Sequence, residues 1–280
     1  MKKIKVKARA KVNFTLDVAE NQNGYHNINS VVASINLADE ITVTKRADRR
    51  ISLKTLGINP QCNVVDNNAY KASKLFKETF NTTGVDIVIN KKIPVGAGLG
   101  GSSADVAGVL KAMDILFGGG HDIVPLANAL GSDCAYMLNG GFAVISGRGT
   151  TVTPIETHSE FYLIIMTALS GVSTREVYNA FDNLKIKQLE CTKTAVELLK
   201  KDQKGEFVKL LKNDLYRPAS EKVPEIKANL ETLSGVAPSV MSGSGSSVFA
   251  VFLDKTARDT AYRALKKKYK EKILKADTDI

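Results

Sequence analysis

The hydrophobic and polar positions near the start of the chain alternate with a period of two. In "IKVKARAKVNFTL", residues 4–16, every second residue is apolar, from Ile4 and Val6 to Leu16. Successive side chains of a strand point to opposite faces, so this pattern predicts one long half-buried strand. Shorter runs with the same period predict further strands at 41–43, 51–53 and 85–89.

Later segments have helical spacing instead. Ala69, Ala72 and Phe76 lie three and four residues apart and predict a helix at 68–79. Apolar residues from Val106 to Phe117 repeat this spacing, and three glycines end that helix. The remaining segments predict helices at 122–130, 174–183, 191–201, 205–212, 224–233 and 256–270, strands at 140–147 and 161–166, and two strands joined by a glycine turn at 239–252.

The order of these elements is strands followed by helices in each half of the chain. This order predicts an α+β fold rather than strict βαβ alternation. The segment at 151–160 is a plausible boundary, so we expect two domains, residues 1–155 and 156–280.

Composition narrows the class of protein. Hydrophobic residues make up 44% of the 280 residues and charged residues 24%, which predicts a folded chain with a proper core. The sequence contains no apolar run of the roughly 18 residues that a membrane span needs, and the basic start lacks a signal-peptide core. Cys62, Cys134 and Cys191 are odd in number and widely spaced, which is typical of reduced cytoplasmic thiols. The three histidines lack metal-ligand spacing, so no zinc site is expected.

The formal net charge of +10 raises the alternative of a nucleic-acid-binding protein. The lysines are scattered, however, and the one dense run, "LKKKYKEKILK" at 265–275, has the pattern of a solvated helix face. The basic residues lack an aromatic platform on which the bases of a single strand could stack. They are equally consistent with attraction of a polyphosphate ligand, so we expect no nucleic-acid partner. A steep salt-dependent shift with mixed RNA would favour the alternative.

The densest chemical signal is the glycine-rich stretch "KKIPVGAGLGGSSADVAGVLKAMDILF", residues 91–117. It contains GxGxxG, but residues 91–95 separate the strand from the first glycine, which argues against a dinucleotide fingerprint. The chain has no Gly-Lys pair, so a Walker A loop is excluded. What remains is a glycine loop that opens a helix with Ser102 and Ser103, an arrangement suited to binding phosphate. A plain tight turn with a serine cap is the structural alternative.

Three segments together resemble the GHMP kinases, the superfamily of galactokinase, homoserine, mevalonate and phosphomevalonate kinases. They are "ARAKVNFTLDV" (8–18), "IPVGAGLGGSSADVA" (93–107) and "MSGSGSSVFAVF" (241–252), in the order in which that superfamily has them. Finer detail resembles its 4-diphosphocytidyl-2-C-methyl-D-erythritol kinase family, above all "GYH" (24–26), followed by "LGSDCAYMLNGGFAVISGRG" (130–149), "GVSTREVY" (171–178) and "LKNDL" (211–215).

The resemblance implies a two-domain α+β GHMP kinase fold with its active site in the cleft between the domains. It implies a cytoplasmic enzyme, a monomer or weak homodimer, that uses ATP as co-substrate with Mg²⁺. The acceptor would be the 2-hydroxyl of a small molecule with a cytidine diphosphate group, in non-mevalonate isoprenoid precursor synthesis. Two alternatives remain: a sibling kinase for homoserine or mevalonate, and a catalytically silent nucleotide-binding protein.

The resemblance also implies roles for individual residues. Asp133, in "GSD", matches the catalytic aspartate, a carboxylate suited to accept the hydroxyl proton. Lys11 matches the catalytic lysine, whose ammonium would favour the charged carboxylate and the developing alkoxide. On pattern alone Lys11 would be one more solvent-facing lysine of an alternating strand, so its role rests on the resemblance.

Two sets of binding residues follow in the same way. His26 is expected to read the cytosine edge and Tyr178 to stack on the base, since imidazole offers distinct donor and acceptor nitrogens and an aromatic ring offers a flat face. The expected substrate-binding residues are Asn13, Tyr25, His26, Thr174 and Tyr178. The expected ATP-binding residues are Asn67, Lys91, Pro94, Gly96, Gly98, Leu99, Gly100, Gly101, Ser102 and Ser103. Asn67 could equally be a helix cap, and Tyr178 a core residue.

Overall fold

The computed structural model describes residues 2–22, 25–60, 62–184 and 190–279, with the backbone alone at 20–22 and 25. The chain forms two compact units. The first consists of Met1–Ala10, Leu37–Val95 and Gly100–Gly140, and the second of Lys11–Asn36, Gly96–Leu99 and Gly141–Ile280. The two domains expected from the boundary at 151–160, residues 1–155 and 156–280, stay a prediction.

The sheet of the first unit is built around parts of two long strands, β1 (Lys3–Asn13) and β3 (Tyr25–Lys45), which have residues in both units. β3 pairs with β1 and, antiparallel, with β5 (Val85–Lys91), and β5 pairs in parallel with β4 (Ile51–Gly57). Along β5 buried and partly buried residues alternate at every position, which confirms the predicted period of two.

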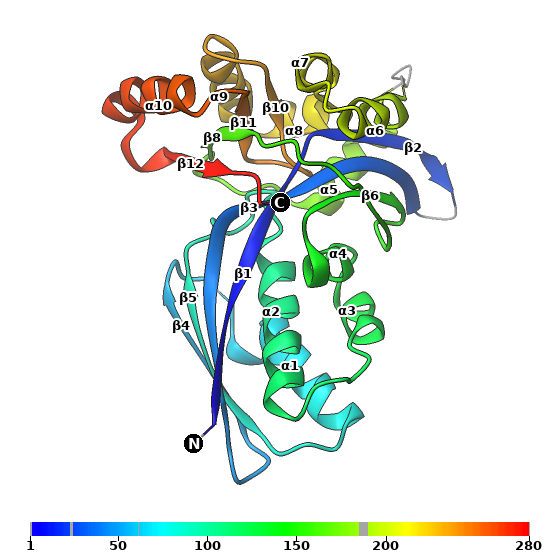
Figure 1. Ribbon diagram of the computed structural model, residues 1–280, viewed down its shortest axis with the longest axis vertical. Helices are drawn as coiled ribbons and strands as arrows, with labels where there is room; N and C mark the ends of the chain where they lie inside the picture. Colours follow the sequence, from blue (N-terminus) through cyan, green and yellow to red (C-terminus); the bar gives the residue numbers. More distant parts are fainter. Residues whose placement is uncertain (1, 23–24, 61, 185–189, 280) are drawn as a thin grey trace. The chain divides into compact units, whose positions relative to one another are not determined.

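Helices of the first unit lie together on one side of these strands (Figure 1). α2 (Gly101–Leu116) closely approaches the sheet at Gly108, where a Cβ atom would lie 2.6 Å from Ile41 and 3.1 Å from Ala8. The described elements of this unit are completed by α1 (Asn68–Thr79), α3 (Val124–Leu130), α4 (Cys134–Asn139) and the short 3₁₀ turn η1 (Val64–Asp66). The helices predicted at 68–79, 106–117 and 122–130 are confirmed.

The second unit contains a four-stranded antiparallel sheet in the order β10-β11-β8-β12. Its central strand β11 is buried at every position, so it reads as an apolar run rather than as an alternation. The strands are β8 (Tyr162–Met166), β10 (Ser239–Met241), β11 (Val248–Phe252) and β12 (Ile273–Asp277). Figure 1 shows α9 (Pro224–Ser234) and α10 (Lys255–Tyr269) beside this sheet.

Other strands of the second unit surround the first part of β3. β2 (Thr15–Gln22) and β6 (Phe142–Gly147) both pair antiparallel with it, and β7 (Thr151–Pro154) pairs with β6. β9 (Lys212–Asn213) adds to β2 in parallel. The helices of this unit not yet given are α5 (Thr174–Asp182), α6 (Thr192–Lys200), α7 (Lys204–Phe207), α8 (Tyr216–Lys222), η2 (Val208–Leu210) and η3 (Lys270–Lys272).

An aromatic cluster lies at the start of β2. The ring of Phe14 is fully buried and contacts four others, with centroid distances of 5.3 Å to Phe161 and Phe207, 5.6 Å to Phe249 and 5.9 Å to Phe142. Four segments distant in sequence therefore contribute to one hydrophobic contact centred on Phe14.

Two predicted elements differ from the structure. The single strand expected over 4–16 is divided at Phe14 into β1 and β2. Phe14 belongs to neither strand, and its N–H donates to the Val31 carbonyl at 2.8 Å. The helix expected over 205–212 ends early, and Lys212 instead begins β9, where pairing with β2 overrides helical propensity. In the part of the chain that the structure describes, no helix has the length and apolar content to cross a membrane.

Candidate active site

The glycine-rich loop joins β5 to α2 and has a left-handed backbone at three positions. The φ angles are +66° at Gly96, +73° at Gly98 and +71° at Gly100. Gly100 is the N-cap of α2 and has no side chain to cap it, and the first helical bond is donated by Ala104 to Gly100 at 2.9 Å. The N–H groups of residues 101–103 therefore stand outside the helical ladder, in the position where helices bind anions.

Gly98 is required by contact with a second glycine turn. A Cβ atom there would collide with the Ser242 carbonyl and lie 2.7 Å from that of Gly245. The Ser242 hydroxyl donates to the Gly98 carbonyl at 3.0 Å and accepts the N–H of Asn13 at 3.3 Å. From the sequence we expect the glycines of this loop to serve phosphate binding. At Gly98, close packing against another turn already requires a glycine.

Backbone bonds fix the neighbouring loop residues in the same unit. Leu99 accepts the N–H of Lys11 at 3.0 Å, and Ala97 accepts the N–H of Ser247 at 3.0 Å. The N-terminal motif, the glycine loop and the C-terminal motif thus meet through residues 96–99.

Lys11 is buried, although the strand positions before it on the same face are exposed. Its side chain is 4% exposed, while Lys3 to Arg9 face solvent at every second position. Lys11 Nζ donates to Asn13 Oδ1 at 2.6 Å, and Asn13 Nδ2 donates to Ser30 at 2.8 Å. The side chain is therefore not one more solvent-facing lysine, and Lys11 and Asn13 form one hydrogen-bonded pair.

Asp133 lies at the start of α4 and is half-buried. It occupies the N-cap position, but its carboxylate does not cap the helix. Two residues earlier, a Cβ atom on Gly131 would lie 3.9 Å from Ser103 Oγ and 3.2 Å from Cys134 Sγ. The "GSD" segment therefore lies beside the first turn of α2, within the first unit. Burial raises the pKa of the Cys134 thiol to about 11.

Lys91 is turned into the protein rather than toward solvent. Its Nζ lies 2.6 Å from Asp39 Oδ2 and 2.7 Å from Asp105 Oδ2. Burial lowers the pKa of Lys91, but its two carboxylate neighbours outweigh that effect and leave it raised. Burial raises the pKa of Asp105 to about 7, against the opposing charge of Lys91. The sequence showed no sign of this cluster, because Asp39 and Asp105 lie far from Lys91 along the chain.

Two asparagines stand at the start of α1. Asn67 caps that helix, accepting the N–H of Ala69 at 2.9 Å, so the structural alternative considered for it is confirmed. Asn68 donates to Ser102 Oγ at 3.1 Å, which links α1 to the serines after the glycine loop. Pro94 is half-buried in the same loop.

Predicted substrate residues come together in the second unit. The rings of His26 and Tyr178 lie 5.1 Å apart at 31°. His26 Nδ1 lies 2.7 Å from the Ala19 carbonyl, which makes it a donor. Nε2 lies 2.9 Å from Asp182 Oδ1, yet among the described residues it has no partner with hydrogen-bond geometry.

Thr174 and Tyr25 complete the predicted substrate set. Thr174, on the first turn of α5, is exposed and lies 2.9 Å from the hydroxyl of Ser244 in the C-terminal glycine turn. The side chain of Tyr25 lies outside the described part of the chain.

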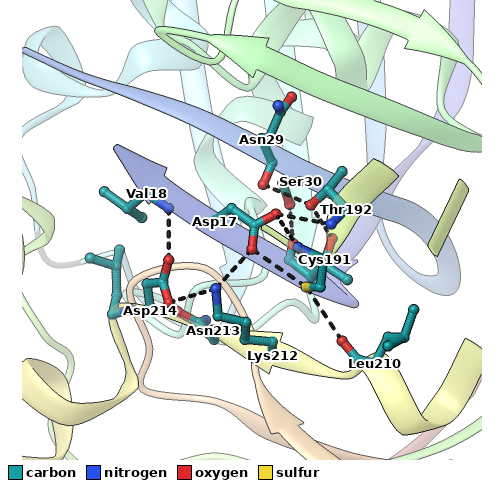
Figure 2. A network of polar contacts seen from close by, with 12 residues as sticks. Asp17, Val18, Asn29, Ser30, Cys191, Thr192, Leu210, Lys212, Asn213 and Asp214 are labelled. Carbon is teal, nitrogen blue, oxygen red and sulfur yellow. Dashed lines mark hydrogen bonds and ion pairs between the residues drawn. The ribbon is translucent and has the colours of Figure 1, made fainter. Parts of the chain in front are cut away.

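A buried polar network, not foreseen from the sequence, holds β2 in place (Figure 2). Asp17 accepts the N–H of Thr192 at 2.9 Å and that of Cys191 at 3.1 Å, at the start of α6. Lys212 Nζ lies 2.9 Å from both Asp17 and Asp214. Burial raises the pKa of Asp17, but the Thr192 N–H and the Lys212 ammonium outweigh it and leave the pKa below its usual value. The tripeptide "KND" (212–214), within the family-like segment "LKNDL", was the sequence signal for this network.

The similarity to known proteins extends along nearly the whole chain. The family profiles described as GHMP kinases N terminal domain and GHMP kinases C terminal match residues 67–147 and 195–271. A 4-diphosphocytidyl-2-C-methyl-D-erythritol kinase of Clostridium beijerinckii is 34% identical over 97% of this chain and 99% of its own length. One of Clostridium botulinum is 35% identical over 94% of this chain and 96% of its own.

Solved structures share the fold. A crystal structure of 4-(cytidine 5'-diphospho)-2C-methyl-D-erythritol kinase superposes with a TM-score of 0.81 and 28% identity, covering 98% of both chains. Homoserine kinase from Cytophaga hutchinsonii gives a TM-score of 0.76 at 20% identity, over all of this chain and 95% of its own, a likeness of fold alone. The chain therefore has the α+β GHMP kinase fold and belongs to the 4-diphosphocytidyl-2-C-methyl-D-erythritol kinase family of the GHMP kinases.

Proposed function

We propose that this protein transfers the γ-phosphoryl group of ATP to the 2-hydroxyl of 4-diphosphocytidyl-2-C-methyl-D-erythritol, in non-mevalonate isoprenoid precursor synthesis. The observation that carries this proposal is the pair of His26 and Tyr178, with ring centroids 5.1 Å apart, in a chain of this family. Cytoplasmic location and a monomeric or weakly dimeric state stay predictions.

The phosphates of ATP are proposed to bind at the opening of α2. The N–H groups of residues 101–103 are not used by the helix, and the helix dipole adds partial positive charge there. We propose that the other predicted ATP-binding residues also serve this site, with Lys91 acting from within the protein because its side chain is buried.

Mg²⁺ is part of the proposal, and the residues present fit it. Mg²⁺ prefers oxygen ligands and keeps water and phosphate oxygens. The hydroxyls of Ser102 and Ser103, at the opening of α2, are such donors. The bound ion would neutralise charge on the polyphosphate.

Proton transfer and charge stabilisation are proposed for two further side chains. Asp133 would accept the proton of the acceptor hydroxyl, because it belongs to the "GSD" segment that lies beside the first turn of α2. Lys11 would stabilise the developing alkoxide, and its burial strengthens the effect of its charge. The two residues lie in different units, so each role is proposed from its own surroundings.

The cytosine is proposed to stack on Tyr178 while His26 reads its edge. Nδ1 of His26 is used by the Ala19 carbonyl, so we assign Nε2, which lies 2.9 Å from Asp182 Oδ1, to the base. Thr174 and Asn13 would contact the rest of the substrate, and Tyr25 is retained as a predicted contact. This pair favours a cytidylyl substrate over homoserine or mevalonate, which have no base to stack.

Phosphorus NMR of the reaction product tests the proposal. With ATP, Mg²⁺ and 4-diphosphocytidyl-2-C-methyl-D-erythritol, we expect ADP and one new phosphomonoester on the 2-hydroxyl, with the diphosphate bridge intact. ADP formation without that monoester, or a phosphate on another hydroxyl, would refute the proposal as stated.

A further inference from the structure

A buried charged cluster lies at the two ends of the glycine loop. Lys91 is the last residue of β5, and its Nζ lies 2.6 Å from Asp39 Oδ2 and 2.7 Å from Asp105 Oδ2. All three side chains are buried, with Lys91 at 6% exposure, Asp105 at 4% and Asp39 at 0%. Buried charges are costly unless they are paired and hydrogen-bonded, so a cluster of this kind needs a reason for its presence.

Asp39 fixes the first residues of the loop. Its Oδ1 accepts the N–H of Lys92 at 2.6 Å and that of Ile93 at 2.8 Å, while its Oδ2 accepts from Lys91. One carboxylate thus determines the direction in which the chain leaves β5.

Asp105 fixes the other end of the glycine loop, where α2 begins. It lies in the second turn of α2, and a Cβ atom at the first residue, Gly101, would lie 3.5 Å from Lys91 Nζ and 3.0 Å from Ile93. The ammonium therefore lies directly against the opening of the helix. The bonds from Lys91 to both carboxylates hold the start of the loop and the start of α2 at a fixed separation.

We propose that Lys91, Asp39 and Asp105 are positioning residues for ATP, acting through the backbone of the phosphate loop. This inference rests on the proposed function, since it assumes that the α2 opening binds the polyphosphate. The Lys91 side chain then orients the N–H groups that bind phosphate rather than touching ATP itself. Its ammonium has two carboxylate partners, which leaves it little capacity to reach a nucleotide.

Two substitutions at Asp105 separate this role from others. Asp105→Ala removes one of the two partners of Lys91 and leaves one ammonium paired with one carboxylate, that of Asp39. We expect the affinity for an ATP analogue with Mg²⁺ to fall by about tenfold or more, since a hydrogen bond to a charged group is worth about that much. Asp105→Asn keeps an oxygen acceptor for Lys91 and should restore affinity to within about threefold of wild type.

A matched control lies on the same helix. Asp114, in the last turn of α2, accepts from His121 Nδ1 at 2.7 Å, and Asp114→Ala removes that contact far from the loop. We expect it to lower thermal stability without changing the affinity for the ATP analogue. A merely structural role for Asp105 would make the two alanine variants behave alike.

The decisive readout is equilibrium binding of a non-hydrolysable ATP analogue with Mg²⁺, with melting temperature measured for every variant. Unchanged or tighter binding by Asp105→Ala overturns the proposal, because freeing Lys91 would help if it touched ATP directly. Equal loss in Asp105→Asn also overturns it. If Asp105→Ala does not fold, Asp105→Ser, whose hydroxyl is too short to reach Lys91, replaces it under the same criteria. Since the assay omits the alcohol, failure of the proposed substrate leaves this result interpretable.

Discussion

The imidazole of His26 lies beside the phenol ring of Tyr178, with centroids 5.1 Å apart and planes inclined by 31°. The first residue stands at the start of β3 and the second on α5. The two residue types assigned to the edge and the face of one base are therefore neighbours. Nδ1 of His26 also lies 2.7 Å from the Ala19 carbonyl, a hydrogen bond that restricts rotation of the ring.

Substitution of these two residues should affect different properties of the substrate. Tyr178→Ala should lose stacking worth roughly 1–3 kcal/mol, raising KM for cytidine and uridine forms of the substrate alike. His26→Ala should instead reduce the preference for cytosine over uracil. Steady-state kinetics with both substrate forms, and ATP affinity as the control, checks both outcomes. If neither variant changes KM for the alcohol substrate, the cytosine site is elsewhere.

Asp133→Asn should abolish phosphoryl transfer while leaving ATP affinity nearly intact. Asparagine keeps the shape of the side chain but cannot accept the hydroxyl proton. A working general base is typically worth 10²–10⁴ in rate, so kcat should fall by about that factor. Single-turnover kinetics measures the chemical step separately from product release. A rate within about tenfold of wild type would remove Asp133 from the role of base.

Gly98→Ala should destabilise the protein more than Gly119→Ala. Both glycines have positive φ, +73° and +79°, so both substitutions incur the cost of a left-handed backbone, about 1–2 kcal/mol. A Cβ atom at Gly119 meets open space, whereas at Gly98 it collides with the Ser242 carbonyl. Urea unfolding of both variants gives the difference, and equal losses would show that the loop moves to accommodate the methyl group.

The thiols should differ sharply in reactivity. Burial, followed by the neighbouring Asp17 carboxylate, raises the pKa of Cys191 to about 12. Alkylation proceeds through the thiolate, so Cys191 should react far more slowly at pH 8 than the exposed Cys62. Iodoacetamide labelling followed by peptide mass spectrometry checks this order, with urea-unfolded protein as the control that labels all sites. Equal rates in the folded protein would contradict the buried network around Asp17.

Periodic patterns in the sequence correctly predicted those helices and strands whose burial follows the local pattern of apolar residues. The period of two in β5 is an example, since this strand buries one regular face. The apolar spacing of α2 is another, although this helix is buried on most sides over residues 104–110. The pattern misled at Lys11 and Asn13, where alternation assigns polar residues to solvent. In the structure both side chains are buried: Lys11 donates to Asn13, whose side chain donates to Ser30.

In the candidate site, too, local features could be predicted from the sequence and tertiary contacts could not. The glycine loop and its serines could be predicted, because a phosphate loop is a local feature of sequence. The Lys91 cluster could not, because Asp39 and Asp105 are single acidic residues whose role depends on tertiary contact. Burial of the Asp17 network likewise depends on the short strand at Lys212, where pairing with β2 replaced the expected helix.

The most direct test of the account compares kcat/KM for phosphorylation of four alcohols by the purified protein, with ATP and Mg²⁺ and with ADP release as the signal. The alcohols are 4-diphosphocytidyl-2-C-methyl-D-erythritol, free methylerythritol, homoserine and mevalonate. We predict that the cytidylyl substrate exceeds the others by at least about a hundredfold, because only it has the base for which stacking on Tyr178 and a hydrogen bond to His26 are proposed. Turnover of free methylerythritol, homoserine or mevalonate with equal or greater efficiency would contradict the account.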